Sequence, residues 1–231
     1  MEARQWDASC PRVYAAWSER GAAWRVTDLP PAHDEAALRL LRDHMLRDET
    51  LCVCCGVADD PESREGILEF WRQRLRARTS LACYEERDGR STLAGVNVCV
   101  VQRRGDVLCV DEVAGAATRN VLRALQLVEA RVDVFAELRV DRVLDALGLC
   151  VRADYRGFSL GGRILAAREG LCAALGVAAT ATLFTGAASQ RLAARAGFRP
   201  LAAATLAQLA AAGLPLPPDD RQLLYMARTF P

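Results

Sequence analysis

The stretch Leu149-Cys-Val-Arg-Ala-Asp-Tyr-Arg-Gly-Phe-Ser-Leu-Gly-Gly-Arg-Ile-Leu165 decides the fold class, because it encodes a strand, a turn, a loop and a helix in order. Its apolar start predicts a strand, and its loop, which contains three glycines, opens a helix that Gly176 ends. The first N–H groups of a helix have no partner within it and lie at the positive end of its dipole. Arg156 and Arg163 add positive charge, and the glycines lack side chains that would keep an anion from the backbone. The stretch therefore predicts a phosphate-binding loop, with a pyrophosphate as its natural occupant.

The spacing within this loop excludes two common phosphate-binding motifs. A P-loop requires a Lys after its second glycine, and this loop has none. A dinucleotide-binding fingerprint requires Gly-x-Gly-x-x-Gly early in the chain, whereas this loop comes about two-thirds of the way along. The remaining pattern, Arg156-Gly-Phe-Ser-Leu-Gly161, resembles motif A of the GNAT-type N-acetyltransferases, Gln/Arg-x-x-Gly-x-Gly/Ala. The fourth position is Ser159, where that family usually has Gly.

Two further passages narrow the resemblance. Residues 41–51, LRDHMLRDETL, resemble the "DEPL" segment of insect arylalkylamine (dopamine-type) N-acetyltransferases, with Thr50 in place of Pro. Residues 184–198 resemble the Ser-rich loop and the Gly-Phe helix end of the same family. The resemblance covers about residues 23–230 and implies an α/β (α+β) fold of the GNAT type, with a mixed central sheet flanked by helices on both faces.

Hydrophobic periodicity predicts the element order β-α-α-β-β-α-β-α-β-α-β, which is that of the GNAT fold. The Asp88-Gly89 pair is a strong hairpin signal between two of these strands. Residues 1–22 lack a clear pattern and are expected to form a loosely packed extension before one domain, 23–231. Strands are expected at 23–29, 80–85, 93–101, 143–151, 177–184 and 223–229, and helices at 34–47, 62–76, 121–135, 162–175 and 188–196.

Composition and charge restrict the class of partner. The chain has 231 residues, is 52% hydrophobic and carries a formal charge of +1, so it has no global attraction to nucleic acid or acidic membranes. No apolar stretch is long enough to span a bilayer, and the N-terminus lacks the pattern of a signal peptide. We therefore expect a cytoplasmic monomer with no nucleic-acid or membrane partner.

The cysteines predict neither a metal site nor a nucleophile. The chain has nine of them, mostly within apolar runs, which is typical of core thiols in a reducing compartment. The cluster at 52–55 lacks a second ligand pair at suitable spacing, because His33 and His44 are the only histidines. Neither histidine has a recognisable partner for a Cys–His catalytic pair.

The resemblance implies that an acetyl group passes from acetyl-CoA to the primary amine of a small molecule, an arylalkylamine. A base must take a proton from the cationic amine, and a carboxylate with a pKa raised by desolvation can do so. The resemblance assigns this role to Glu49, with Asp48 beside it. The alternative, which the residues alone favour, is that both acids are solvated polar residues at the end of a helix. The resemblance places Ser189 and Thr185 near the sulfur, where the alternative role is helix capping. The implied cofactor-binding residues are Leu149, Cys150, Val151, Arg156, Gly157, Phe158, Ser159, Leu160, Gly161, Gly162 and Ser189.

Two alternatives stay open at this stage. One is a non-catalytic binding module of the same fold, because the Cβ of Ser159 disfavours a positive φ that the loop can require; its hydroxyl can instead donate to phosphate. The other is a different acceptor, such as a polyamine, an amino acid or a protein N-terminus. The acceptor pocket is expected between the first helix pair and loop 184–190, with Phe70, Trp71, Phe184 and Phe198 as candidate lining or core residues.

Overall fold

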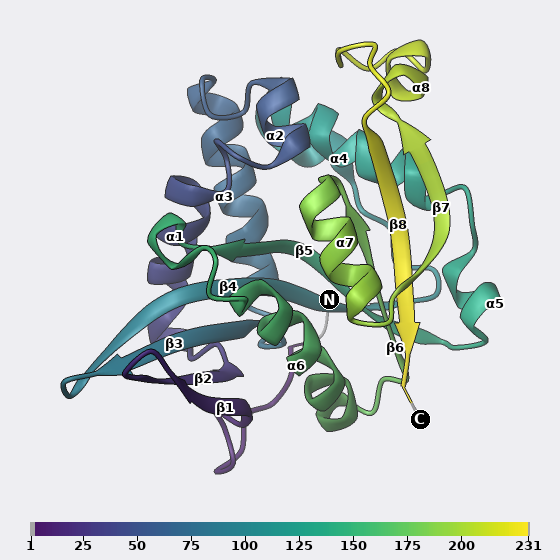
Figure 1. Ribbon diagram of the computed structural model, residues 1–231. Coiled ribbons are helices and arrows are strands. Elements are labelled where there is room, and N and C mark those ends of the chain that lie inside the picture. Colours follow the sequence, from purple (N-terminus) through teal and green to yellow (C-terminus); the bar gives the residue numbers. More distant parts are fainter. Residues whose placement is uncertain (1–2, 231) are drawn as a thin grey trace.

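A computed structural model describes residues 3–230, which form an eight-stranded sheet with helices on both faces (Figure 1). The strand order is β1-β2-β3-β4-β5-β6-β8-β7, and every neighbouring pair is antiparallel except the parallel β5 and β6. The mixed α/β sheet predicted from the sequence is confirmed. The strands are β1 (Val13–Glu19), β2 (Ala22–Asp28), β3 (Leu81–Arg87), β4 (Arg90–Arg103), β5 (Arg142–Val151), β6 (Ala179–Phe184), β7 (Arg199–Thr205) and β8 (Gln222–Thr229).

Two helical layers cover the sheet. The first comprises α1 to α4, and α6 and α7 lie on the opposite face (Figure 1). No helix in the described residues is long and apolar enough to cross a membrane. The helices are α1 (Asp34–His44), α2 (Thr50–Cys55), α3 (Pro61–Leu75), α4 (Ala116–Glu129), α5 (Val134–Leu138), α6 (Leu160–Leu175), α7 (Ala187–Arg195) and α8 (Leu206–Ala211), and the short 3-10 turns are η1 (Pro31–His33), η2 (Val110–Glu112) and η3 (Ala153–Tyr155).

The period of two along a strand distributes side chains between the two cores. In β5, Val143 packs into the core under α1 to α4, whereas Leu144 and Ala146 pack into the core under α6. The Asp88-Gly89 hairpin forms as predicted between β3 and β4, with φ values of +51° and +72°. Both central residues thus have the left-handed conformation of a type I′ turn.

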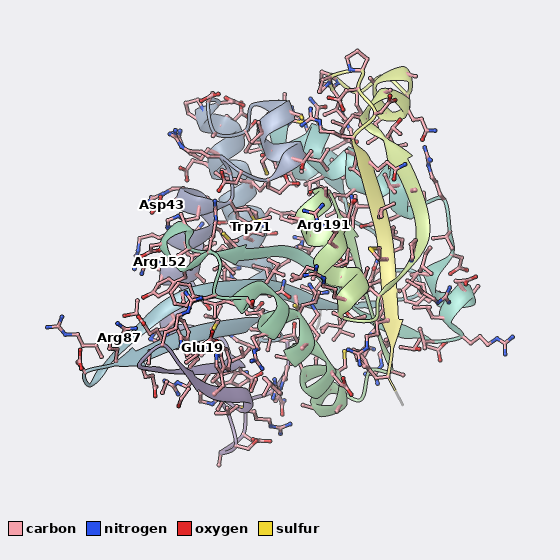
Figure 2. All side chains as sticks on the ribbon, in the orientation of Figure 1. Glu19, Asp43, Trp71, Arg87, Arg152 and Arg191 are labelled. Atoms are coloured by element: carbon pink, nitrogen blue, oxygen red, sulfur yellow. The ribbon has the colours of Figure 1, made fainter. Side chains whose placement is uncertain are left out.

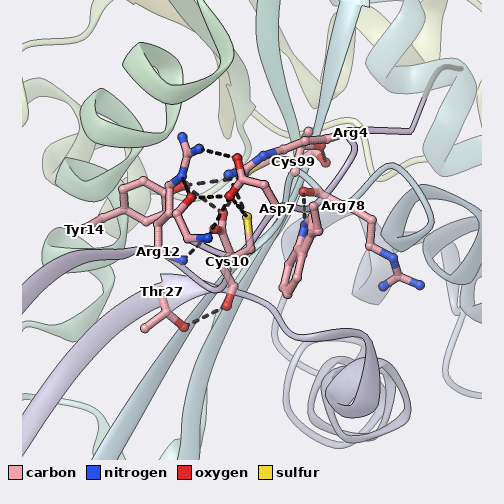
Figure 3. A network of polar contacts seen from close by, with 12 residues as sticks. Arg4, Asp7, Cys10, Arg12, Tyr14, Thr27, Arg78 and Cys99 are labelled. Atoms are coloured by element: carbon pink, nitrogen blue, oxygen red, sulfur yellow. Dashed lines mark hydrogen bonds and ion pairs between the residues drawn. The ribbon is translucent and has the colours of Figure 1, made fainter.

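The N-terminal region differs from the loose extension expected for residues 1–22. Residues 13–19 form β1, which pairs antiparallel with β2 at the edge of the sheet. The buried Asp28 carboxylate also holds the segment, because it accepts hydrogen bonds from Arg4 Nη1 at 2.6 Å, the Arg12 N–H at 2.9 Å and the Tyr14 hydroxyl at 2.7 Å (Figure 3). An edge strand with half-exposed side chains leaves only a weak alternation in the sequence. Residues 1 and 2 lie outside the described part.

Two other segments depart from expectation. The helix expected over 121–135 is divided into α4 and α5, because the Asp133 carboxylate accepts from the N–H groups of Phe135 and Ala136, each at 3.0 Å, and so begins a new helix. The Ala-rich segment after residue 198 forms β7 and α8. Alanine favours helix, but pairing with β8 places residues 199–205 in the sheet, so tertiary contacts override local propensity.

Candidate active site

The sheet opens between β5 and β6. These strands pair only at Leu144↔Thr180 and Asp145↔Ala181, although β5 continues to Val151 and β6 to Phe184. Figure 1 shows β6 and β8 running at a steep angle to β1 through β5. Residues 146–151 of β5 therefore have no strand partner on the β6 side, and they line a cavity there.

Side chains from two other elements hold this free part of β5. Trp71 of α3 donates its indole N–H to the Leu147 carbonyl oxygen at 2.7 Å, and Figure 2 shows Trp71 in the interior beside β5. Asn97 of β4 donates its amide N–H to the Gly148 carbonyl oxygen at 2.8 Å, where the β4–β5 register shifts. Gly148 has a φ of +146°, which other residues rarely adopt. These contacts fix the backbone just before Leu149.

The loop before α6 presents unpaired backbone donors. None of the five N–H groups from Gly157 to Gly161 donates a hydrogen bond within residues 3–230. Ser159, the N-cap of α6, has φ +58° and ψ +17°, and Gly157 has φ +84°. The Ser159 backbone thus occupies the left-handed region that its Cβ disfavours, and its side chain caps nothing. Free amides at a helix N-terminus suit an anion.

Two apolar side chains of this loop pack against the core under α6. The Phe158 ring packs 5.8 Å from Trp24, centroid to centroid, and Leu160 is buried in the core under α6. The guanidinium of Arg163, which the sequence analysis expected to add charge at the loop, lies 5.0 Å over the Trp17 ring. A Cβ at Gly161 or Gly162 would lie 3.4 Å from Leu192, so the two glycines also allow α6 and α7 to approach closely.

Arg20 lies 4.3 Å over the Phe158 ring of this loop, whereas Arg156 lines the cavity and forms an ion pair with Asp48. Both side chains of this pair are half exposed, at 50% and 51%. An exposed pair contributes little to stability, about 0–1 kcal/mol. Arg156 is therefore free to exchange this carboxylate for a phosphate group.

Glu49 lies where α2 begins. Its Oε2 accepts from the Cys52 N–H at 2.7 Å, so Glu49 is the N-cap of α2. Its Oε1 accepts from the Thr185 hydroxyl, which connects α2 to the end of β6. The carboxylate is thereby held in the cavity by two donors from different parts of the chain.

Thr185 and Ser189 also line this cavity, but in different ways. Thr185 does not cap α7, because the N-cap is Gly186 and no side chain caps it. Ser189 is half-buried and donates its hydroxyl to the Gly186 carbonyl oxygen at 2.8 Å. The capping alternative therefore does not apply to Thr185, whose hydroxyl serves Glu49.

The cavity has a volume of about 410 Å³ and brings most of the predicted site residues together. Its walls come from α1 to α4, the free part of β5, and residues 182–192. Phe70, Trp71 and Phe184 line it, whereas Phe198 is a core residue packed on Phe184. The predicted residues that line it are Glu49, Leu149, Cys150, Val151, Arg156, Gly161, Thr185 and Ser189, while Gly157, Phe158, Ser159, Leu160 and Gly162 lie beside it in the loop.

The thiols of the cavity are protonated at neutral pH. Burial raises the pKa of Cys150 to about 12 and raises the pKa of Cys52 as well. Because the thiolate is the nucleophilic form, neither cysteine is suited to act as a nucleophile.

Comparison with known proteins decides the fold family. The sequence matches no family model and no curated protein. Solved structures do match: a yellow fever mosquito protein with the provisional name arylalkylamine N-acetyltransferase 7 superposes with a TM-score of 0.90, at 29% identity over 99% of both chains. The chain has the GNAT N-acetyltransferase fold. Arylalkylamine N-acetyltransferase 2 of Aedes aegypti (TM-score 0.78, 17% identity, 90% of this chain and 99% of that one) shares this fold. So does the Drosophila melanogaster polyamine N-acetyltransferase, which forms N-acetylagmatine (TM-score 0.76, 21% identity, 90% of this chain and all of that one).

The sequence analysis missed the contribution of three residues to this site. It named Trp71 as a candidate lining or core residue, but the hydrogen bond from Trp71 to β5 has no local signal. Asn97 is a polar residue in an apolar strand, and a buried amide requires partners, so its position was a usable signal. Glu129 continues the apolar stripe of Val121 and Leu125 at intervals of four, which places a carboxylate on the buried face of α4.

Proposed function

We propose that this protein is an acetyl-CoA-dependent N-acetyltransferase that acts on a small primary amine. The observation that carries the proposal is the row of free N–H groups from Gly157 to Gly161 beside the unpaired edge of β5, next to the cavity that holds Glu49. The similarity to insect N-acetyltransferases supports it.

The residues present fit acetyl-CoA. The loop amides and Arg156 would bind the pyrophosphate, since fixed backbone donors and a guanidinium are both suited to phosphate oxygens. The free edge of Leu149–Val151 would bond the amides of the pantetheine arm. One of its N–H groups would polarise the thioester carbonyl, as preorganised dipoles do where negative charge develops.

The chemistry then requires two proton movements. Glu49 takes a proton from the ammonium group of the acceptor, which frees the nitrogen lone pair. The nitrogen attacks the thioester carbon, the C–N bond forms, and the C–S bond breaks. The nitrogen releases its second proton to solvent, while Ser189 donates a proton to the departing thiolate and regains one from solvent. Thr185 positions Glu49 through its hydrogen bond.

The cavity walls support a small cationic acceptor with an apolar or aromatic part. Phe70, Trp71 and Phe184 provide apolar and aromatic surface, which would accommodate the arylalkylamine expected from the sequence. The same walls would also accommodate the alkyl chain of a polyamine. The acidic side chains Asp48, Glu49 and Glu129 on the cavity favour a cationic acceptor of either class.

A panel assay tests the proposal. Release of free thiol from acetyl-CoA is measured with tryptamine, dopamine, octopamine, spermidine and glycine, and the products are identified by mass spectrometry. The sequence contains no lysine, so the protein supplies no lysine acceptor that would obscure the signal. Thiol release with at least one amine is expected. Acetyl-CoA binding by calorimetry without turnover of any amine would favour the non-catalytic module, and absence of binding would overturn the acetyl-CoA assignment itself.

A further inference from the structure

Glu129 is the carboxylate of the cavity that the proposed mechanism does not use. It is the last residue of α4 and lines the cavity together with Val121, Leu122 and Leu125 of the same helix. It is only partly exposed, and within residues 3–230 it accepts no side-chain hydrogen bond and forms no ion pair. An ionised carboxylate without a partner in such a place is costly, because burial disfavours the charged form.

Asp145 adds a second buried carboxylate near Glu129. It lies on β5, is 9% exposed, and likewise has no ion pair within the described chain. Burial and the charge of Asp145 both raise the pKa of Glu129. The charges of Arg74 of α3 and Arg168 of α6 stabilise the Asp145 carboxylate, since both lower the pKa of Asp145. No cation lowers the pKa of Glu129 in the same way. Within residues 3–230, Glu129 therefore faces the charge of Asp145 and no cation that lowers its own pKa.

A third titratable group of this region, Tyr225, supplies no positive charge either. Tyr225 of β8 is buried, and the charges of Asp145 and Glu129 help to raise its pKa. Glu129 at neutral pH must therefore either hold a proton or meet a cation from outside the protein. A ligand cation in the cavity would take the place of that proton.

We propose that Glu129 binds a second cationic group of the acceptor, so that the substrate is a diamine or a guanidinoalkyl amine. The inference rests on the acetyltransferase function proposed above. One amino group of the acceptor would lie at Glu49, and its alkyl chain would follow the apolar wall of α4 to Glu129. A monoamine lacks the group that Glu129 needs, so it would leave this carboxylate without a partner.

Matched acceptors test the inference. The kcat/KM of the wild-type protein is measured with 1,3-diaminopropane, 1,4-diaminobutane, 1,5-diaminopentane and agmatine, and with propylamine, butylamine and pentylamine as counterparts without the second cation. A charge-assisted contact predicts a preference of about 10- to 100-fold for the best dication over its matched monoamine. Glu129→Gln should abolish this preference, because it should lower the kcat/KM of the dications about 10- to 100-fold more than that of the matched monoamines.

Two further variants separate binding from structure. Glu129→Asp keeps the charge on a shorter side chain, so the optimum should move to a longer diamine. Glu112→Gln changes an exposed acid on η2 and should alter neither ratio. An active enzyme that uses monoamines and diamines equally, or a Glu129→Gln variant that loses both equally, overturns this inference and leaves the acetyltransferase function standing. No thiol release with any amine overturns both.

Discussion

Substitution of Glu49 tests the base and the helix cap separately. In the wild-type protein the Cys52 N–H donates to the Glu49 carboxylate at 2.7 Å. The side-chain amide of Glu49→Gln keeps an oxygen that can accept this hydrogen bond, but the amide cannot take up a proton. We expect kcat to fall by roughly 10²- to 10⁴-fold, the usual contribution of a positioned base, which corresponds to about 3–5 kcal/mol of barrier. The free energy of unfolding should change by less than about 1 kcal/mol, because the cap is retained.

Glu49→Ala removes both functions. The lost N-cap costs about 1 kcal/mol, and the Thr185 hydroxyl, which now donates to Glu49, loses its acceptor at about the same cost. The sum of about 2 kcal/mol corresponds to a fall in Tm of about 4–8 °C for a chain of this size. The two variants should therefore share the loss in kcat and differ in stability.

The assay is thiol release at saturating acetyl-CoA from pH 6 to 9, with Tm from differential scanning calorimetry. Asp48→Asn is the matched control, because it changes the adjacent acid, whose one ion pair in the described part of the chain is the exposed pair with Arg156. In Glu49→Gln, the residual rate should recover as pH approaches the pKa of the amine, since free amine then forms without a base. A wild-type kcat for Glu49→Gln across this range would refute the role of Glu49 and leave it as a helix cap.

Three further predictions concern the loop and the buried acid. Ser159→Gly removes a Cβ from a residue at φ +58°, which relieves about 1 kcal/mol of backbone strain but adds about 0.5–1 kcal/mol of conformational entropy to the unfolded chain. The free energy of unfolding should therefore change little, and acetyl-CoA should bind as tightly or more tightly. A weaker Kd by calorimetry would show instead that the Ser159 hydroxyl donates to phosphate. Arg156→Ala should weaken acetyl-CoA binding by about 10- to 100-fold. The Tm should hardly change, since the free protein loses an exposed ion pair with Asp48. An unchanged Kd would place the pyrophosphate elsewhere. Burial raises the pKa of Asp145 from 3.8 to about 6, so the native state holds a proton there that the unfolded chain has released, and wild-type stability falls by up to about 3 kcal/mol as pH rises between these values. Asp145→Asn removes this loss, so its unfolding free energy in urea relative to wild type should rise from pH 4 to pH 7; a flat or falling difference would contradict the pKa shift.

The sequence by itself determined the order of the central elements. The Asp88-Gly89 hairpin and the glycine-containing loop before α6 depend on local backbone preferences, which one short segment expresses completely. The same holds for the run of free donors at the start of α6, since every helix N-terminus leaves such groups. The sequence analysis did not predict three features whose local signals are weak or misleading: the edge strand β1, the Ala-rich strand β7, and the break between helices at Asp133.

Only the tertiary structure decided how the site is assembled. Glu49 and Thr185 are 136 positions apart, and Asp48 and Arg156 are 108 apart, so no local pattern relates them. The opening between β5 and β6 arises because their pairing stops after Asp145, a property of strand twist and of packing against α3 through Trp71. The raised pKa of Glu129 likewise depends on which side chains surround it in space. Local preferences act over a few residues, whereas burial, charge balance and the shape of a cavity are set by contacts between distant parts of the chain.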